Sequence, residues 1–257
     1  MKAFINQKFK HRLSVILLCQ FLGFHAYATG TQHQQLLPVD EADRDPSLLQ
    51  FRERLLTAAR HHEPERLVEL VDIGIFNGVN RPAGAQEFAD IWRIDAFESD
   101  FWDILRRVVN LGGGFVRSEK GVLFCSPYIF TEFPGNLDGR QHGALIKEKA
   151  ELMSQPSSAS DVVTSLSYNV LKVHDWNPVP DLNGTEGLFW LKVSTLDGTP
   201  GFLQREDIYG PNEHSACFLQ NDAGHWKMVS FFTQIGPMAG TPGEMPNFTA
   251  TENHVEE

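Results

Sequence analysis

The chain has 257 residues, 42% of them hydrophobic, which is enough for one large or two small domains with a buried core. It carries 33 Asp and Glu against 22 Lys and Arg, a formal net charge of −11. A surface this acidic is not expected to hold nucleic acid or an anionic membrane through its overall field, and the simplest role of the charge is solubility.

The first 28 residues have the three parts of a secretory signal peptide. Residues 1–12 are basic, residues 13–24 form an apolar run too short for a comfortable membrane span, and Ala28 ends a small-x-small pattern suited to cleavage. Cys19 raises a lipoprotein alternative, which the bulky Leu18 before it disfavours. We therefore expect an exported protein, periplasmic or secreted. Loss of the segment's four cationic side chains would take the charge from −11 to −15.

Residues 29–46 are polar and are expected to form a flexible leader, followed by a helical α+β domain over residues 47–143. Helical spacing of apolar residues predicts four helices in this domain. The first begins at a Ser47 cap, and the second begins at Pro64 and runs through Val71. The third is marked by Phe88, Ile91 and Trp92, and the fourth by a Ser99 cap with Phe101, Trp102, Leu105, Val108 and Val109.

The glycines at 112–114 follow the fourth helix. They predict a helix end and a turn rather than a phosphate-binding loop, because such a loop precedes a helix. Two strands are expected next, at residues 115–116 and 122–133. A linker rich in Pro, Gly and Asn over residues 134–139 then leads into the following part of the chain.

Short apolar runs alternate with turn signals over residues 144–209. Asp197-Gly198 between two such runs is a strong hairpin signal. Several short strands at this spacing predict a small barrel or sandwich. The expected strands lie at Leu152-Met153, Val162-Val163, Val170–Val173, Phe189–Val193 and Gly201–Leu203.

A series of residues in this stretch follows the order of a known domain: Leu152, Ser154, Pro156, Ser157, Val162-Val163, Val170–Val173, Trp190 with Val193, Asp197-Gly198 and Gly201–Leu203. In this order the stretch resembles the bacterial SH3-like (SH3b) domain. It departs from the family at Met153, where Arg is usual, at Gln155, where Gly is usual, and in an insert over residues 174–188. The resemblance implies a small SH3-like β-barrel that binds a peptide, a cell-wall component or a protein partner.

Residues 210–236 have the pattern of a β-hairpin, with a turn at residues 221–224. Alternation places Trp226, Met228 and Phe232 on one face and Val229 and Phe231 on the other. Since both faces are apolar, we expect the hairpin to be buried, returning to residues 47–143 beside the strand around residues 124–125. The predicted fold class is then α+β, and the first domain is expected to clasp the barrel. Residues 237–257 are expected to form a disordered tail.

Two cysteines remain if the first 28 residues are removed. In an exported chain, Cys125 and Cys217 favour one disulfide. The alternative is two buried free thiols that pack as small hydrophobic side chains.

The sequence offers little catalytic chemistry. His61 and His62 are adjacent and point about 100° apart on a helix, so they predict a solvated turn rather than a metal site. Cysteine peptidases of cell walls often carry SH3-like domains, but Cys125 lies in an apolar strand, and no Gly-x-Ser-x-Gly elbow is present. A catalytic Cys125–His225 pair is the remaining enzyme alternative. We predict no enzyme activity, no cofactor and no metal.

Aromatic and acidic residues around the expected barrel mouth are the candidate ligand contacts: Tyr168, Asp175, Trp176, Asp181, Trp190, Phe202 and Tyr209. Trp190 and Phe202 are equally explained as barrel core. Trp176, in a polar loop, is the best candidate for an exposed contact. The leading interpretation is a non-catalytic envelope protein that binds a partner. The alternatives are a cell-wall hydrolase or amidase with a Cys-His pair, and an inhibitory or structural protein that uses the acidic insert.

Overall fold

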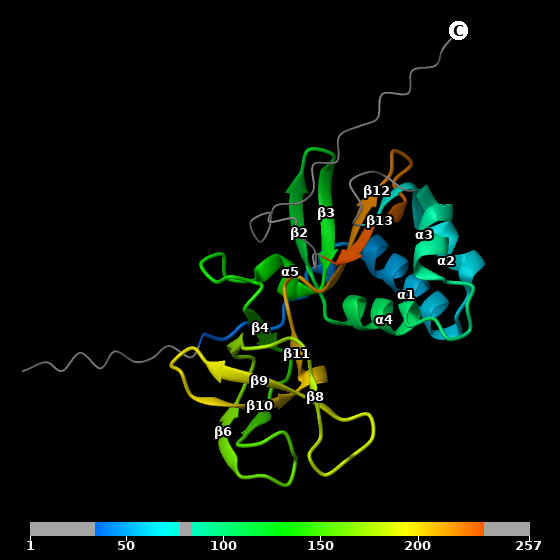
Figure 1. Ribbon diagram of the computed structural model, residues 1–257. Helices are drawn as coiled ribbons and strands as arrows, with labels where there is room; N and C mark the ends of the chain where they lie inside the picture. The colour runs from blue at the N-terminus through cyan, green and yellow to red at the C-terminus, as the bar shows by residue number, and fades with distance from the viewer. Residues whose placement is uncertain (1–33, 78–83, 234–257) are drawn as a thin grey trace, which may run out of the picture. The chain divides into compact units, whose positions relative to one another are not determined.

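The computed structural model describes residues 34–77 and 84–233, which form a mixed α+β protein (Figure 1). The predicted signal peptide and the predicted tail from residue 237 lie outside the described residues. No helix within these two ranges combines the length and the apolar character needed to cross a bilayer.

The predicted flexible leader is wrong from residue 34 onward, because this segment packs on the rest of the chain. Leu36 is buried, and its N–H donates to the carbonyl of Tyr168 at 2.7 Å. Asp40 forms a β-bridge with Gly113, and a short 3-10 helix, η1 (Ala42–Arg44), follows it. Polar composition alone suggested disorder, but Leu36 and Ala42 bury enough apolar surface to hold the segment in place.

In the part of the chain that the structure describes, four α-helices precede the first hairpin: α1 (Pro46–His61), α2 (Pro64–Leu70), α3 (Gly84–Trp92) and α4 (Phe101–Asn110). The cap of α1 is Asp45 rather than Ser47: its Oδ1 accepts from the N–H groups of Ser47 and Leu48, at 2.8 and 3.1 Å. The prediction that Val71 belongs to the second helix is wrong. Val71 begins strand β1 (Val71–Phe76).

A five-stranded sheet has the order β1-β13-β12-β3-β2, with β2 (Gly114–Ser118), β3 (Gly121–Ser126), β12 (His214–Gln220) and β13 (Trp226–Thr233). The C-terminal hairpin thus lies between β1 and β3, and the predicted pairing with the strand around residues 124–125 is confirmed. One sheet face packs on α1–α4 in the main core, which contains Phe51, Phe88, Phe124 and Phe231. The other face holds a smaller apolar cluster with Cys125 and Cys217.

A β-bulge changes which residues of β13 face the helices. Cys217 pairs with Ser230 but Phe218 pairs with Met228, so Val229 is an extra residue on β13. The predicted alternation is therefore wrong beyond this point. Phe231 joins Met228 in the main core, whereas Phe232 lies in the cluster on the opposite face.

The predicted second strand of residues 122–133 stops at Ser126. Pro127 follows, and the chain forms helix α5 (Tyr128–Glu132). The Tyr128 and Ile129 side chains enter the main core, and Phe130 packs in the cluster beside the disulfide. The aromatic and β-branched residues of this run predicted a strand. A helical turn forms instead, and it directs Tyr128 and Ile129 toward the main core and Phe130 toward the cluster beside the disulfide.

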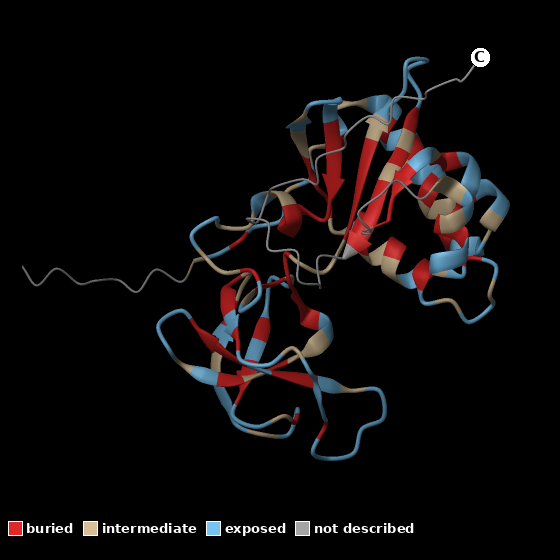
Figure 2. Ribbon diagram, turned by 45° about the horizontal axis from the view of Figure 1, so that its top comes forward, coloured by how far each residue is buried: buried red, intermediate tan, exposed pale blue. Residues whose placement is uncertain are grey.

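The second sheet has the strand order β11-β4-β7-β9-β10-β5-β6, with β8 paired to β9. Its strands are β4 (His142–Leu145), β5 (Ala150–Met153), β6 (Val162–Leu166), β7 (Val170–Val173), β8 (Val179–Pro180), β9 (Phe189–Thr195), β10 (Pro200–Gln204) and β11 (Ile208–Tyr209), with 3-10 helix η2 (Arg205–Asp207) before β11. The path does not close: among the described residues β6 and β11 are its two ends. The strands of both sheets carry most of the buried positions, and residues 182–187 in the loop after β8 are exposed (Figure 2).

Candidate functional site

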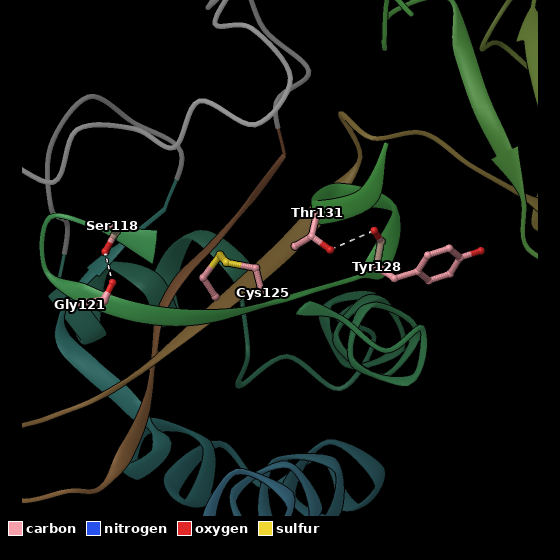
Figure 3. Close-up of a disulfide and its surroundings, with 6 residues drawn as sticks. Ser118, Gly121, Cys125, Tyr128 and Thr131 are labelled. Atoms are coloured by element: carbon pink, nitrogen blue, oxygen red, sulfur yellow. Dashed lines mark hydrogen bonds between the residues drawn. A yellow bond between two sulfur atoms is a disulfide. The ribbon is translucent and has the colours of Figure 1, made fainter. Parts of the chain in front are cut away.

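The cysteine pair lies on neighbouring antiparallel strands. Cys125 on β3 is directly opposite Cys217 on β12, and their sulfurs are 2.06 Å apart, a disulfide (Figure 3). Both residues are fully buried. A bonded sulfur cannot act as a thiolate nucleophile, and His225 lies exposed in the β12–β13 turn. The structure therefore contradicts the catalytic Cys125–His225 alternative.

Trp190 is buried at 2% exposure on the outer face of the second sheet. Its strand neighbours Leu191 and Val193 belong to the sheet's inner core, and successive strand side chains point to opposite faces. The indole Nε1 of Trp190 donates to Asp181 Oδ1 at 3.0 Å. Phe202, on β10, is half-buried and pairs with Met153 across the sheet.

The insert supplies the cover over Trp190. Burial alone would raise the pKa of Asp181, but donors from Trp190, Thr185 and Asn183 outweigh it, so the pKa lies below its usual range. The insert is tied to the β5–β6 loop, because the Leu182 N–H donates to Pro156 O at 2.9 Å. Asp181 is thus a structural carboxylate that fixes the insert.

Trp176 is half-buried rather than free. Its indole Nε1 donates to Arg140 O at 2.8 Å, and the Arg205 guanidinium lies 5.8 Å from its ring centroid. The ring also packs on Gly143 and Gly210, where an added Cβ would approach it to 2.9 Å. Asp175 is exposed, and its carboxylate accepts from the N–H of Asn177 at 2.9 Å.

The two candidate tyrosines are held by backbone contacts. Tyr209 is buried, its hydroxyl donates to His214 O at 2.6 Å, and the Arg107 guanidinium lies 5.2 Å from its ring centroid. Burial, with the nearby Glu213, raises the pKa of Tyr209. Tyr168 is half-buried, and its N–H donates to Lys147 O at 3.0 Å. Trp176 touches Gly210, next to Tyr209, but these residues do not form one open aromatic shelf.

A cleft of about 320 Å³ lies on the second sheet, across β5, β9, β10 and η2. Its lining residues are Lys149, Ala150, Glu151, Met153, Ser158, Trp190, Leu203, Gln204 and Asp207. Of the sequence candidates, only Trp190 lines it. The sequence does contain a signal for the site, because Lys149, Glu151 and Met153 recur every second residue and so share one face of the chain at β5.

Asp207 is the buried charge of this cleft, with 6% of its surface exposed. Lys147 Nζ lies 2.5 Å from its Oδ1 in an ion pair. The Lys147 ammonium therefore supplies the compensation that this buried carboxylate needs.

Within the described ranges no group of three His, Cys, Asp or Glu residues is placed to bind a metal ion. His61 ends α1, and His62, in the left-handed conformation, caps it and stacks on Trp102 at 5.3 Å.

Searches of protein-family models, of curated proteins and of solved structures found no match to this chain.

Proposed function

We propose that the protein is an exported, non-catalytic binding protein whose second sheet, an SH3-like unit, holds an extended peptide segment of an envelope partner. The observation that carries this proposal is the cleft across β5, β9, β10 and η2. Its apolar lining residues include Met153, Leu203 and Trp190, which are buried. Its polar lining comes from Lys149, Glu151, Ser158, Gln204 and Asp207. Such a mixture suits recognition of a ligand with both a polar backbone and side chains.

The exposure of the aromatic side chains favours a peptide over a glycan. A sugar ring that stacks on an aromatic residue needs an open ring face, whereas Trp190 is 2% exposed and Tyr209 3%. Trp176 has ring contacts with Arg205 and two glycine backbones. A cell-wall glycan is therefore not the proposed ligand, and the test below includes glycan binding as a possible result.

One further observation, the disulfide, supports both the non-catalytic and the exported parts of the proposal. The disulfide removes the only nucleophile that the sequence suggested, and disulfides persist in oxidising compartments outside the cytosol. An inhibitor acting through the acidic insert is disfavoured, since Asp181 is buried and Asp175 accepts from its own turn.

The test is binding of the chain from residue 29 to an array of synthetic extended decapeptides. We expect Glu151→Lys to reduce the captured signal strongly, because it reverses a charge that lines the cleft. Glu186→Lys, an identical charge change on the exposed insert, is the matched control and should bind as wild type. Equal binding by both variants, or sedimentation with purified peptidoglycan without any peptide binding, would overturn the proposal.

A further inference from the structure

The geometry points to recognition of a cationic side chain, a lysine or arginine of the bound peptide, by Asp207, with Lys147 as an internal placeholder for that cation. This inference rests on the proposed function, since it names the chemistry that the cleft selects. In the ligand-free protein Lys147 neutralises Asp207, and in the complex the peptide's cation replaces it.

The fold fixes Asp207 in the cleft. Asp207 ends η2, between β10 and β11, and its backbone carbonyl accepts from the N–H of Ile146 at 2.9 Å. This bond places Lys147, the next residue along the chain, beside the carboxylate. The Asp207 side chain is 8% exposed and lines the cleft.

The two members of the ion pair differ in how they meet solvent. A carboxylate removed from water is costly unless a cation stays beside it. The Lys147 side chain is 48% exposed, so its ammonium can return to water at little cost. The buried anion is therefore fixed, and its partner is exchangeable.

The neighbouring guanidinium groups do not compete for Asp207. Arg205 is paired with Glu213 at 2.9 Å and donates to the carbonyl of Ile208. Arg107 donates to the carbonyls of Glu206 and Ile208, at 2.9 and 3.2 Å. Lys147 is the cation in ion-pair contact with Asp207 among the described residues.

The inference is tested with three pentapeptides that differ at one central position: lysine, Nε-acetyl-lysine, and glutamate, each flanked by glycines and blocked at both ends. Calorimetric titration of the chain from residue 29 should give binding of the lysine peptide that weakens as salt is added. The acetylated peptide has nearly the same shape but no charge, so it should bind at least about tenfold more weakly.

Two substitutions should change the affinity for the lysine peptide in opposite directions. Asp207→Asn keeps the shape and removes the anion, and should weaken binding at least about tenfold. Lys147→Ala removes the side chain that competes with the peptide for Asp207. It should strengthen binding by about tenfold, because the peptide no longer has to displace Lys147. The lysine peptide should also raise the melting temperature of Lys147→Ala more than that of wild type, since it restores the missing counter-charge.

The possible outcomes distinguish failure of cation recognition by Asp207 from failure of the proposed peptide binding. If Lys147→Ala is less stable but binds the lysine peptide as wild type does, the ion pair is purely structural and the inference is wrong. If all three peptides bind equally and Asp207→Asn changes nothing, the cleft binds peptides without reading charge. If no peptide of the trio or of the decapeptide array binds, the proposed function itself fails.

Discussion

His214 lies against aromatic rings, with centroids 5.6 Å from Trp92 and 6.2 Å from Phe231. Burial lowers its pKa below the ordinary 6.5; Glu213 opposes this shift, and Arg205 adds to it. The unfolded chain therefore binds a proton at this residue more readily than the folded protein. The free energy of unfolding should fall as the pH drops below about 6.5, until the folded-state pKa is passed.

The change that tests this coupling is His214→Gln. Between neutral and mildly acidic pH, the free energy of unfolding of the variant should decrease less than that of wild type. The pH slope of the unfolding free energy that His214 contributes stays below about 1.4 kcal/mol per pH unit, the limit for the binding of one proton. Urea unfolding at a series of pH values measures it. Wild type measured in parallel is the reference, and an unchanged slope in His214→Gln would contradict the account.

The Trp190 indole and the Asp181 carboxylate form a buried hydrogen bond of 3.0 Å. Trp190→Phe keeps a ring but leaves Asp181 Oδ1 without this donor, which should cost about 1–3 kcal/mol of unfolding free energy. Leu182→Ala, at a side chain that is 62% exposed in the same insert, should cost less than about 0.5 kcal/mol. Equal losses in denaturant unfolding would show that the bond does not hold the insert.

The candidate site was only partly predictable from single residues. Aromatic side chains drew attention to Trp176 and Trp190, but a loop position does not reveal that Gly143 and Gly210 leave room for the Trp176 ring to pack on backbone. Asp207 gave no local signal, because its burial comes from the folding of η2 against Ile146. Contacts of this kind arise between distant parts of the chain.

Helix α1 depends on Asp45, whose carboxylate accepts from two N–H groups of the first turn. The hydrogen bond from the Ser47 hydroxyl, at 2.6 Å, is the main cause that lowers the pKa of Asp45, and the two backbone donors add to it. Asp45→Ala should therefore lower the free energy of unfolding by about 0.5–2 kcal/mol at neutral pH. The loss should shrink as the pH falls through the carboxylate pKa, since the protonated group no longer accepts as well.

Chemical unfolding at neutral and acidic pH measures this prediction. Asp43→Ala, at an exposed carboxylate in η1, is the matched control and should change stability by less than about 0.5 kcal/mol. If both variants lose the same amount, Asp45 is not the cap that stabilises α1.

Periodicity predicted the helices and most strands, and its errors have physical causes. Val71, Ile73 and Ile75 alternate, which suits a strand, yet β1 forms only because β13 from the far end of the chain pairs with it. The bulge at Val229 interrupts the period of two, so the faces of Phe231 and Phe232 could not be assigned by counting. Local pattern gives the type of element, and distant pairing decides its limits.

The disulfide closes a loop of 92 positions, which contains the whole of the second sheet. On the chain-entropy account, replacing both Cys125 and Cys217 with alanine should lower the free energy of unfolding by about 4–5 kcal/mol. Ser126→Ala, on the same strand, removes a buried hydroxyl that has no hydrogen bond among the described residues, so stability should stay the same or rise slightly. Urea unfolding compares them, and a double cysteine variant as stable as Ser126→Ala would contradict the prediction.

The arrangement of the chain as a whole follows from pairing between its ends. β12 and β13 enter the sheet between β1 and β3, so the second sheet lies in sequence between strands of the first. Compartment and cysteine count predicted the bonded pair, and turn spacing predicted the strands between them. Only the part of the cleft at β5 has a signal in the sequence, because the rest of its lining comes from strands and loops that pair only after folding.

In the proposed function, the ligand binds in the cleft across β5, β9, β10 and η2. The most direct measurement is a titration of isotope-labelled protein with the lysine pentapeptide, followed by backbone amide NMR shifts. We predict shifts that saturate and centre on Glu151, Gln204 and Asp207. Saturating shifts centred instead around Trp176 and Tyr168, with those three amides unchanged, would contradict the claim.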